Sequence, residues 1–462
     1  GKTITANLTF DGATIIKDIY GGGNEGLTDT TNILIESGTI EGTIYGAGFG
    51  STSQTNYVNI IIKSDVNNVY GGGFAGIAGV TSVDLISNTV VGSVFGGGFQ
   101  GPTTTATVSL NGANITEDIY GGGDEGLTSS TTVLINSGTV GGTIYGAGRG
   151  ALSHTENINV LIKTDINKVY GGGNAGSCGD TVVRIEKGTV EDNVYGGGYA
   201  GTSQNTKVQI DDSNNLSGIL IKGSVFGGGE GITASVYEST DVYIDLALDM
   251  TVTEQLESLG DISGISNVTV NFNGTYSKIL GSVYGGGDLG QVGEGIINII
   301  NNTASISQTA ELTVTIKNGY IKGSVFGAGN GVPPIDTVYN LTMGAVFGET
   351  NVVVNGGYIE GSYEVDATTY YKGSIYGGGN QSRIYSDDTA TNVFVNQTEA
   401  SPNIVIYGSV FGGGDRGSKT STNASVPTTI GKAFVNIQND AATTKIYFVS
   451  GGVYGDGNFC LV

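Results

Sequence analysis

The chain has little of several residue types on which many protein functions depend. Its 462 residues include no Trp, one His, two Cys and five Pro, and 19 basic residues stand against 42 acidic ones, a formal net charge of −23. So acidic a chain disfavours binding to nucleic acid or to an anionic membrane through basic patches. No apolar run is long enough to span a bilayer, which argues against membrane insertion.

The scarce Cys and His residues offer little chemistry. Cys178 and Cys460 lie too far apart to meet in a locally wound fold. We interpret them as unpaired thiols, with a pairing between molecules through Cys460 as the alternative. His154 lies in a polar segment without a partner pattern, so we expect a solvated loop residue. These residues predict neither a disulfide scaffold nor a histidine-based catalytic network.

Glycine is abundant, with 82 residues, and it recurs in a regular pattern. An Ile or Val, then a Tyr or Phe, then a glycine triplet or a close variant first appears at 19–23, and the aromatic returns every 25 residues as far as Tyr195. Repetition at such a period is typical of a solenoid. We interpret the recurring aromatics as a structural ladder. Its members are Tyr20, Tyr45, Tyr70, Phe95, Tyr120, Tyr145, Tyr170, Tyr195, Phe226, Tyr284, Phe326, Tyr376, Phe411 and Tyr454.

A longer repeat lies over the first, because the segment 19–101 reappears 100 residues later with modest substitutions. Beyond Tyr195 the spacing becomes unequal, and the extra residues are expected to form loops on one face. We therefore divide the chain into a regular solenoid, 1–230, and a continuation with insertions, 231–462. Residues 252–259, in the longest insertion, are the one stretch with a plausible helical turn.

Each repeat unit predicts one coil of a parallel β-helix, an all-β fold. Two or three short strands and their turns consume about 25 residues, and equivalent positions stack about 4.8 Å apart. Residues Thr39 to Ile44 alternate polar with apolar or glycine, as a strand does. We expect about fifteen coils in an elongated rod some 70 Å long at this spacing.

Within a coil, the aliphatic residue of the pattern is expected to point inward and its polar predecessor outward. Strict alternation then turns the aromatic outward, whereas a bend at the glycines turns it inward; both remain open. The glycines either supply positive φ at a corner or leave room for close backbone approach. In both cases Gly71, Gly72 and Gly73 should resist replacement by Val.

Several motifs resemble chemical sites but lack the context that such sites require. Gly-x-Gly-x-x-Gly recurs, as at 21–26, without the helix that a dinucleotide site needs. Acidic residues after the glycines, such as Asp124 and Asp288, do not recur at the spacing of a calcium-binding β-roll, although incidental calcium remains open. The two Asp-Asp pairs, Asp211-Asp212 and Asp387-Asp388, are expected in solvated loops. We predict no catalytic residue, no cofactor and no resident metal.

The segments GTIEGTIYGAG, NTVVGSVFGGG, KGTVEDNVYGGG and NGYIKGSVFGAG resemble the Gly-rich repeats of large adhesin-like surface proteins of gut and anaerobic bacteria. The resemblance covers nearly the whole chain, tightly to about residue 230. It implies export, a parallel β-helix and a role in attachment or surface structure. It transfers no catalytic or binding residue.

Together these observations predict a non-catalytic, self-assembling structural or adhesive β-solenoid at a bacterial surface or outside the cell. It would serve as a stalk, an adhesin segment or a filament subunit. The alternative is a carbohydrate-binding or polysaccharide-degrading β-helix. The chain begins without Met and stops within a repeat at 453–459, so we expect a longer parent protein. The expected partners are a second copy joined end to end or flanking domains. Glycans, contacted by insertion aromatics such as Tyr363, Tyr370 and Tyr371, are a further candidate.

Overall fold

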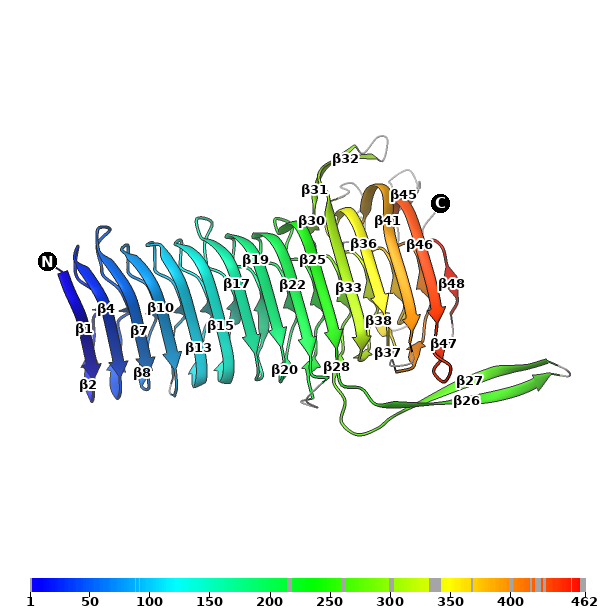
Figure 1. Ribbon diagram of the computed structural model, residues 1–462, viewed down its shortest axis with the longest axis horizontal. Helices are drawn as coiled ribbons and strands as arrows, with labels where there is room; N and C mark the ends of the chain where they lie inside the picture. Colours follow the sequence, from blue (N-terminus) through cyan, green and yellow to red (C-terminus); the bar gives the residue numbers. More distant parts are fainter. Residues whose placement is uncertain are drawn as a thin grey trace. The chain divides into compact units, whose positions relative to one another are not determined.

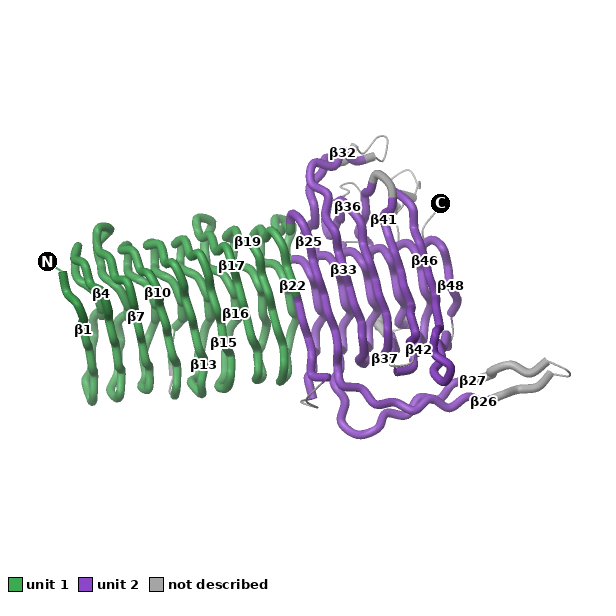
Figure 2. Tube along the Cα trace, viewed as in Figure 1, with its two compact units in different colours: residues 1–207, 229–236 green, residues 208–228, 237–462 purple. Residues whose placement is uncertain are grey.

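The structure of the protein is a computed structural model (Figure 1). The residues that it describes are 2–87, 89–90, 92–213, 218–259, 262–298, 303–331, 342–366, 369–398, 402–415, 418–419, 425–426, 429–449 and 451–457. Its contacts divide the chain into two units (Figure 2). Unit 1 comprises Gly1–Lys207 and Gly229–Val236, and unit 2 comprises Val208–Gly228 and Tyr237–Val462.

Unit 1 is a stack of coils whose strands pair in parallel, and three rows of strands line it. The first row holds long strands: β1 (Lys2–Phe10), β4 (Leu27–Ile35), β7 (Gln54–Ile62), β10 (Ile77–Leu85), β13 (Thr103–Ile115), β15 (Leu127–Val140), β17 (His154–Ile162), β19 (Ser177–Ile185) and β22 (Thr202–Asp211), the last divided between the units. The second row contains the repeated pattern: β3 (Ile19–Tyr20), β6 (Ile44–Tyr45), β9 (Val69–Tyr70), β12 (Val94–Phe95), β14 (Ile119–Tyr120), β16 (Thr143–Tyr145), β18 (Lys168–Tyr170) and β21 (Val194–Tyr195). The third row is short: β2 (Ala13–Ile15), β5 (Gly38–Ile40), β8 (Asp65–Val66), β11 (Thr89–Val90) and β20 (Thr189–Val190), its place being taken in two coils by the ends of β13 and β15.

Unit 2 repeats the three rows. The first contains β25 (Ser235–Asp245), which is divided between the units, β30 (Gln291–Val292), β33 (Ala310–Asn318), β36 (Val346–Val354), β41 (Ile384–Gln397) and β46 (Thr429–Asn439). The second contains β24 (Val225–Phe226), β29 (Val283–Tyr284), β35 (Val325–Phe326), β40 (Ile375–Tyr376), β43 (Val410–Phe411) and β48 (Val453–Tyr454). The third contains β23 (Leu220–Ile221), β28 (Lys278–Ile279), β34 (Tyr320–Ile321), β37 (Gly357–Ile359), β42 (Ile404–Ile406) and β47 (Ile446–Phe448).

The strand register confirms that one repeat is one circuit of the backbone. Ile19 pairs with Ile44, and Ile44 pairs with Val69, so each step along the second row is one repeat of the sequence. The predicted all-β parallel β-helix is therefore confirmed. The described residues contain no helix, and accordingly no helix long and apolar enough to cross a membrane is found among them.

The insertions of unit 2 are antiparallel hairpins. They are β26 (Met250–Leu259) with β27 (Ile262–Phe272), β31 (Glu294–Asn298) with β32 (Thr303–Gln308), β38 (Ser362–Asp366) with β39 (Thr369–Lys372), and β44 (Ser418–Lys419) with β45 (Ser425–Val426). The predicted helical turn at 252–259 is wrong. Apolar and polar residues alternate from Met250 to Thr253, which is a strand period, and β27 supplies the partner strand.

The core lies between the rows and is built from stacked β-branched residues. Ile33, Ile44 and Val69 are fully buried, and each has a counterpart in the next coil. The aromatic that follows the aliphatic residue is also buried from Tyr45 to Phe411, and Tyr120 is only 1% exposed. The chain therefore bends after the aliphatic residue, and both side chains are covered.

Close approach between coils explains the glycine triplets. A Cβ on Gly71 would lie 2.2 Å from the carbonyl oxygen of Gly96 in the next coil, and one on Gly73 would lie 2.4 Å from the carbonyl of Gly48 in the preceding coil. Gly71 does not have a positive φ. The left-handed corner comes two residues after the triplet, where non-glycine residues such as Ala175 (φ 65°) occupy it. Of the two explanations left open by the sequence, steric room is therefore the one that applies.

Candidate functional site

The aromatic ladder runs from coil to coil within each unit. In unit 1, neighbouring rings from Tyr20 to Tyr195 stack with centroids 4.5–5.1 Å apart and planes within 14° of parallel. In unit 2, the rings from Phe226 to Tyr454 stack at 4.7–4.9 Å. These spacings match the separation of adjacent strands, so each ring packs on its copy in the next coil.

A second column, here called the outer column, consists of the residue that directly follows each glycine triplet. In unit 1 its first member is Asn24. The next three are Phe49, Phe74 and Phe99, whose rings stack at 5.1 and 5.0 Å. These rings meet the ladder edge-on, as Phe49 meets Tyr20 with an interplanar angle of 85°. Phe49 is 41% exposed. The outer column therefore covers the ladder on its solvent side.

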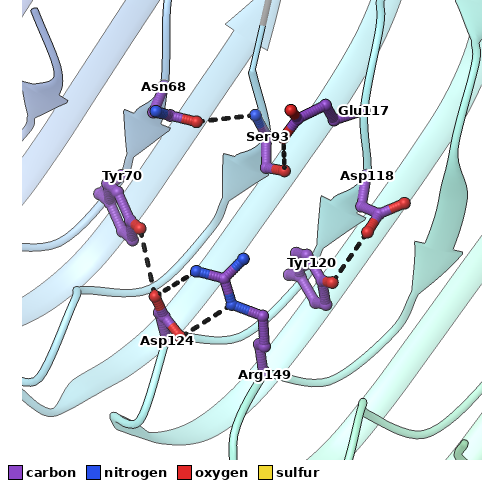
Figure 3. A network of polar contacts seen from close by, with 8 residues as sticks. All are labelled: Asn68, Tyr70, Ser93, Glu117, Asp118, Tyr120, Asp124 and Arg149. Atoms are coloured by element: carbon purple, nitrogen blue, oxygen red, sulfur yellow. Dashed lines mark hydrogen bonds and ion pairs between the residues drawn. The ribbon is translucent and has the colours of Figure 1, made fainter.

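Further along unit 1 the outer column becomes charged, and Asp124 and Arg149 form its strongest contact. Arg149 donates from Nε to Asp124 Oδ1 at 3.0 Å and from Nη2 to Asp124 Oδ2 at 2.6 Å (Figure 3). Its guanidinium lies 4.9 Å from the centroid of Phe95 and 5.7 Å from that of Tyr120. Tyr70 Oη donates to Asp124 at 3.3 Å. The bidentate pair raises the pKa of Arg149 still further, so this cation stays charged over the ladder.

Lys168 and Glu230 form a comparable charged network over the aromatic ladder in another part of unit 1. Lys168 Nζ lies 2.9 Å from Asp192 and 3.4 Å from Glu230, and it sits 5.8 and 5.7 Å from the ring centroids of Tyr170 and Tyr195. Tyr170 Oη donates to Glu230. In both networks an acid accepts a hydrogen bond from a ladder hydroxyl and a cation lies over the rings. The hydroxyls of the buried Tyr70 and Tyr170 are thereby satisfied.

Unit 2 fills its outer column with amides and acids. Asn330 Nδ2 donates to Asp288 Oδ1 at 2.9 Å, and Asn380 Nδ2 donates to Asn330 Oδ1 at 2.9 Å. The backbones of these residues are joined by parallel bridges that continue to Asp415. The outer column therefore runs across coils as a hydrogen-bonded ladder, and its side chains bind one another.

Burial raises the pKa of the ladder tyrosines. Desolvation is the largest cause for Tyr45 and Tyr145, and the nearby Asp18 and Asp118 carboxylates add to it, so that the pKa of each rises to about 12. The pKa of Tyr120 and of Tyr170 is raised for the same main reason. An ionised phenolate in the ladder is thus strongly disfavoured.

We expect the folded protein to lose stability in strong alkali. The pKa of Tyr45 and Tyr145 is about 12 in the folded state and about 10 in an unfolded chain. Their neutral form therefore contributes stability that is complete below pH 10 and is lost as the pH rises toward 12. Absorbance at 295 nm, followed with circular dichroism, should show tyrosinate forming together with loss of strand signal. Full ionisation near pH 10 with an intact strand signal would contradict this expectation.

His154 lies at the start of β17, so its prediction as a loop residue is wrong. Its Nδ1 lies 2.8 Å from Ser177 Oγ and its Nε2 lies 3.1 Å from Glu156 Oε2. The set resembles a catalytic triad in composition only. The backbone N–H of Ser177 already donates to the Ser153 carbonyl in the strand pairing, so this N–H is not free to act as an oxyanion donor.

Cys178 is a buried thiol, 6% exposed and unpaired. Its Sγ lies 3.1 Å from Ser203 Oγ, and burial raises its pKa to about 11. A thiol held protonated in this way is a poor nucleophile. Cys460 lies outside the described residues.

The expectation of a solvated Asp211-Asp212 pair is wrong for Asp212, which is 3% exposed. Asp212 accepts from the N–H of Ala247 at 2.8 Å and from Ser277 Oγ at 2.6 Å. These two residues flank the β26–β27 insertion, so the carboxylate fixes both ends of that hairpin. The side chains of Asp387 and Asp388, and those of Tyr363, Tyr370 and Tyr371, lie outside the described part.

Among the described residues, no group of three or more His, Cys, Asp or Glu side chains is placed to hold a metal ion. Comparison of the chain with protein-family models, with curated proteins and with solved structures finds no match.

Sequence reasoning missed the charged contacts of the outer column, although a signal for one of them was present. Asp124 and Arg149 occupy the same place in consecutive repeats, and stacked coils place such residues in direct register. Opposite charges one period apart therefore predict an ion pair in a β-helix. The Lys168–Glu230 contact carries no such signal, because the two residues are not a multiple of the period apart.

Proposed function

We propose that the protein is a non-catalytic structural β-solenoid that acts at a cell surface or outside the cell, as a stalk, an adhesin segment or a filament subunit. The observation that carries this proposal is the aromatic ladder, in which the ring of each coil stacks on the ring of the next within each unit. In a solenoid each coil contacts only its neighbours, so a repeated contact of this kind adds stability in proportion to length.

The use of the polar groups supports a non-catalytic role. The carboxylates of Asp124 and Asp212 are committed to Arg149 and to the hairpin ends. Catalysis needs groups that are free to bind or exchange protons with a substrate. We expect no release of reducing ends when the protein is incubated with a panel of polysaccharides, and turnover of any of them would contradict this role.

The acidic composition and the resemblance of the repeats to adhesin-like proteins support a location outside the cell. The net charge of −23 favours solubility and discourages nonspecific adhesion to anionic surfaces. An antibody against the purified chain should label intact cells of the source organism, and protease treatment of intact cells should remove the label. A cytoplasmic marker serves as the negative control. Labelling that needs cell lysis would contradict the proposed location.

Glycan binding is a second candidate, and the exposed apolar side chains of the long row in unit 1 favour it. Tyr57 is 55% exposed and pairs in register with Thr30 on one side and Val80, 43% exposed, on the other. Leu27 and Ile77 are 45% and 42% exposed. An exposed aromatic on a flat strand face is a surface on which a sugar ring can pack.

A glycan array separates this candidate from a purely structural role. Binding that Tyr57→Ala reduces at least tenfold would support a glycan-binding surface. The matched control is Tyr237→Ala, because Tyr237 is also exposed, at 38%, and lies outside this cluster. Equal binding by both variants would remove the Tyr57 surface from consideration.

A further inference from the structure

Arg383 is a buried cation in the described part of unit 2. It directly precedes β41, its backbone carbonyl accepts from the N–H of Val346 at 2.8 Å, and it is only 2% exposed. Its Nη1 lies 3.5 Å from Tyr385 Oη, at the outer limit of a hydrogen bond. Among the described residues, its Nε and Nη2 have no hydrogen-bond partner. The guanidinium therefore lies in the interior with most of its donors unused.

An arginine cannot relieve its burial by losing its proton. The guanidinium stays charged at ordinary pH, whereas a buried Lys can become neutral. A buried charge without a partner is strongly destabilising, so such charges are normally paired. Arg149 shows the usual solution in the same chain, because its Nε and Nη2 hold both carboxylate oxygens of Asp124. Arg383 has the same two donors available for an anion.

Tyr385 supplies a second buried donor beside the guanidinium. It is 1% exposed, and burial raises its pKa although the charge of Arg383 opposes the rise, so the hydroxyl keeps its proton. A neutral hydroxyl is not a counter-ion for Arg383. The hydrogen bond that the described residues give Tyr385 Oη is one that it accepts, from Arg383. Its own O–H is therefore free to donate to a further acceptor.

An apolar cluster and the β31–β32 hairpin enclose these donors. The ring of Tyr385 stacks on that of Phe347, with centroids 5.4 Å apart, and Ala304 and Ile306 of β32 pack against both. A Cβ on Gly295 of β31 would lie 2.5 Å from the Phe347 ring, so the hairpin backbone rests on this ring. Figure 1 shows the hairpin beside β36 and β41, and β32 contacts both strands. Such surroundings suit a small ligand with few polar groups.

The number and charge of the donors select the class of anion. Nε and Nη2 are parallel donors that match two oxygens of one group, and the Tyr385 hydroxyl adds a third donor. A monocarboxylate carries one charge and two oxygens, which one guanidinium and one hydroxyl can satisfy. A phosphate carries more charge and more oxygens, so part of it would remain buried without a partner.

We propose that Arg383 and Tyr385 bind a small monocarboxylate in unit 2, beside the β31–β32 hairpin. The guanidinium donates from Nε and Nη2 to the two carboxylate oxygens, as Arg149 does to Asp124. The Tyr385 hydroxyl donates to one of the same oxygens. The ligand neutralises a cation that the chain cannot discharge. The site does not depend on the surface role proposed above, so the two proposals can fail separately.

Differential scanning calorimetry of the full chain tests the site in sodium chloride, sodium acetate and sodium phosphate at equal ionic strength. A ligand that binds only the folded state stabilises it further as its concentration rises. We therefore expect the melting temperature to rise with acetate concentration and to stay constant in chloride. Ion chromatography of the denatured native chain detects a carboxylate that was retained through purification.

Three variants assign the response to these residues. Arg383→Met removes the cation and keeps an apolar side chain of similar length, a kind of replacement that buried charges often tolerate. It should fold and lose the response to acetate. Tyr385→Phe keeps the ring and should weaken acetate binding about tenfold through the lost hydrogen bond. The matched control is Arg184→Met, because Arg184 lies exposed on β19, and it should respond as the native chain does.

The outcomes separate the site from its alternatives. A native chain that melts alike in all three salts and releases no anion would overturn the site. A response to acetate that persists in Arg383→Met would place binding elsewhere and would also overturn it. If Arg383→Met does not fold, an unchanged response in Tyr385→Phe would count against the site in its place. Greater stabilisation by phosphate than by acetate would overturn the choice of a carboxylate.

Discussion

Replacing Gly377 by Ala should lower the free energy of unfolding of unit 2 by about 3 kcal/mol, the upper range for an overpacked interior. The added Cβ would lie 2.2 Å from the backbone carbonyl of Gly412. Backbone atoms of a neighbouring coil cannot rotate away as a side chain can, so the two coils must separate locally. Differential scanning calorimetry would measure the fall in the melting temperature.

The matched control is Gly455→Ala, the same substitution at the same place in a coil of the same unit. Because a Cβ there meets nothing within 4 Å, its effect at low protein concentration should stay within about 0.5 kcal/mol. If the two variants melt alike, steric approach between coils is not the reason for the glycines.

Tyr120→Ala should cost about 4 kcal/mol, typical of deleting a buried aromatic side chain. The Tyr120 ring is 1% exposed and stacks on Phe95 at 4.7 Å and on Tyr145 at 4.8 Å. Removing it leaves a cavity and unstacks two neighbours. The midpoint of denaturant unfolding, followed by circular dichroism, measures the loss.

Tyr120→Phe separates stacking from hydrogen bonding at the same position. It retains the ring and loses the bond from Tyr120 Oη to Asp118, which is 2.9 Å long, so it should cost only about 1 kcal/mol. Phe95 occupies the adjacent place in the native ladder, which shows that the stack accommodates Phe. A loss from Tyr120→Phe as large as that from Tyr120→Ala would assign the stability to the hydroxyl network and not to the stacked rings.

The fold of one coil could be predicted because the residue pattern that specifies it is local in the sequence and recurs in every repeat. The pattern at Ile19-Tyr20 and its return at Ile44-Tyr45 define both the strand and its register, since identical residues in consecutive coils pair. The direction of the aromatic side chain could not be predicted, because it depends on the bend of the backbone after the aliphatic residue. Whether the glycines provide steric room or positive φ likewise depends on the distance between neighbouring coils. The sequence of one coil does not specify that distance.

The insertions were predicted less well because their partners lie far away in the sequence. The helical interpretation of 252–259 failed because β26 gains its partner strand from β27 and an apolar surface from the third row. Asp212 was expected in solvent, but Ala247 and Ser277, 35 and 65 residues away, enclose it. Contacts of this kind do not recur at the spacing of the repeats, so a comparison of equivalent positions in successive repeats does not detect them.

Because the second-row strands of unit 1 always meet at the same step of one sequence repeat, a whole coil can be added or removed and the coils on either side still fit one another. DNA copying errors between near-identical stretches would then change the number of coils while keeping the backbone register between neighbouring coils. A population could adjust the length of this unit in increments of about 4.8 Å, without passing through a misfolded product.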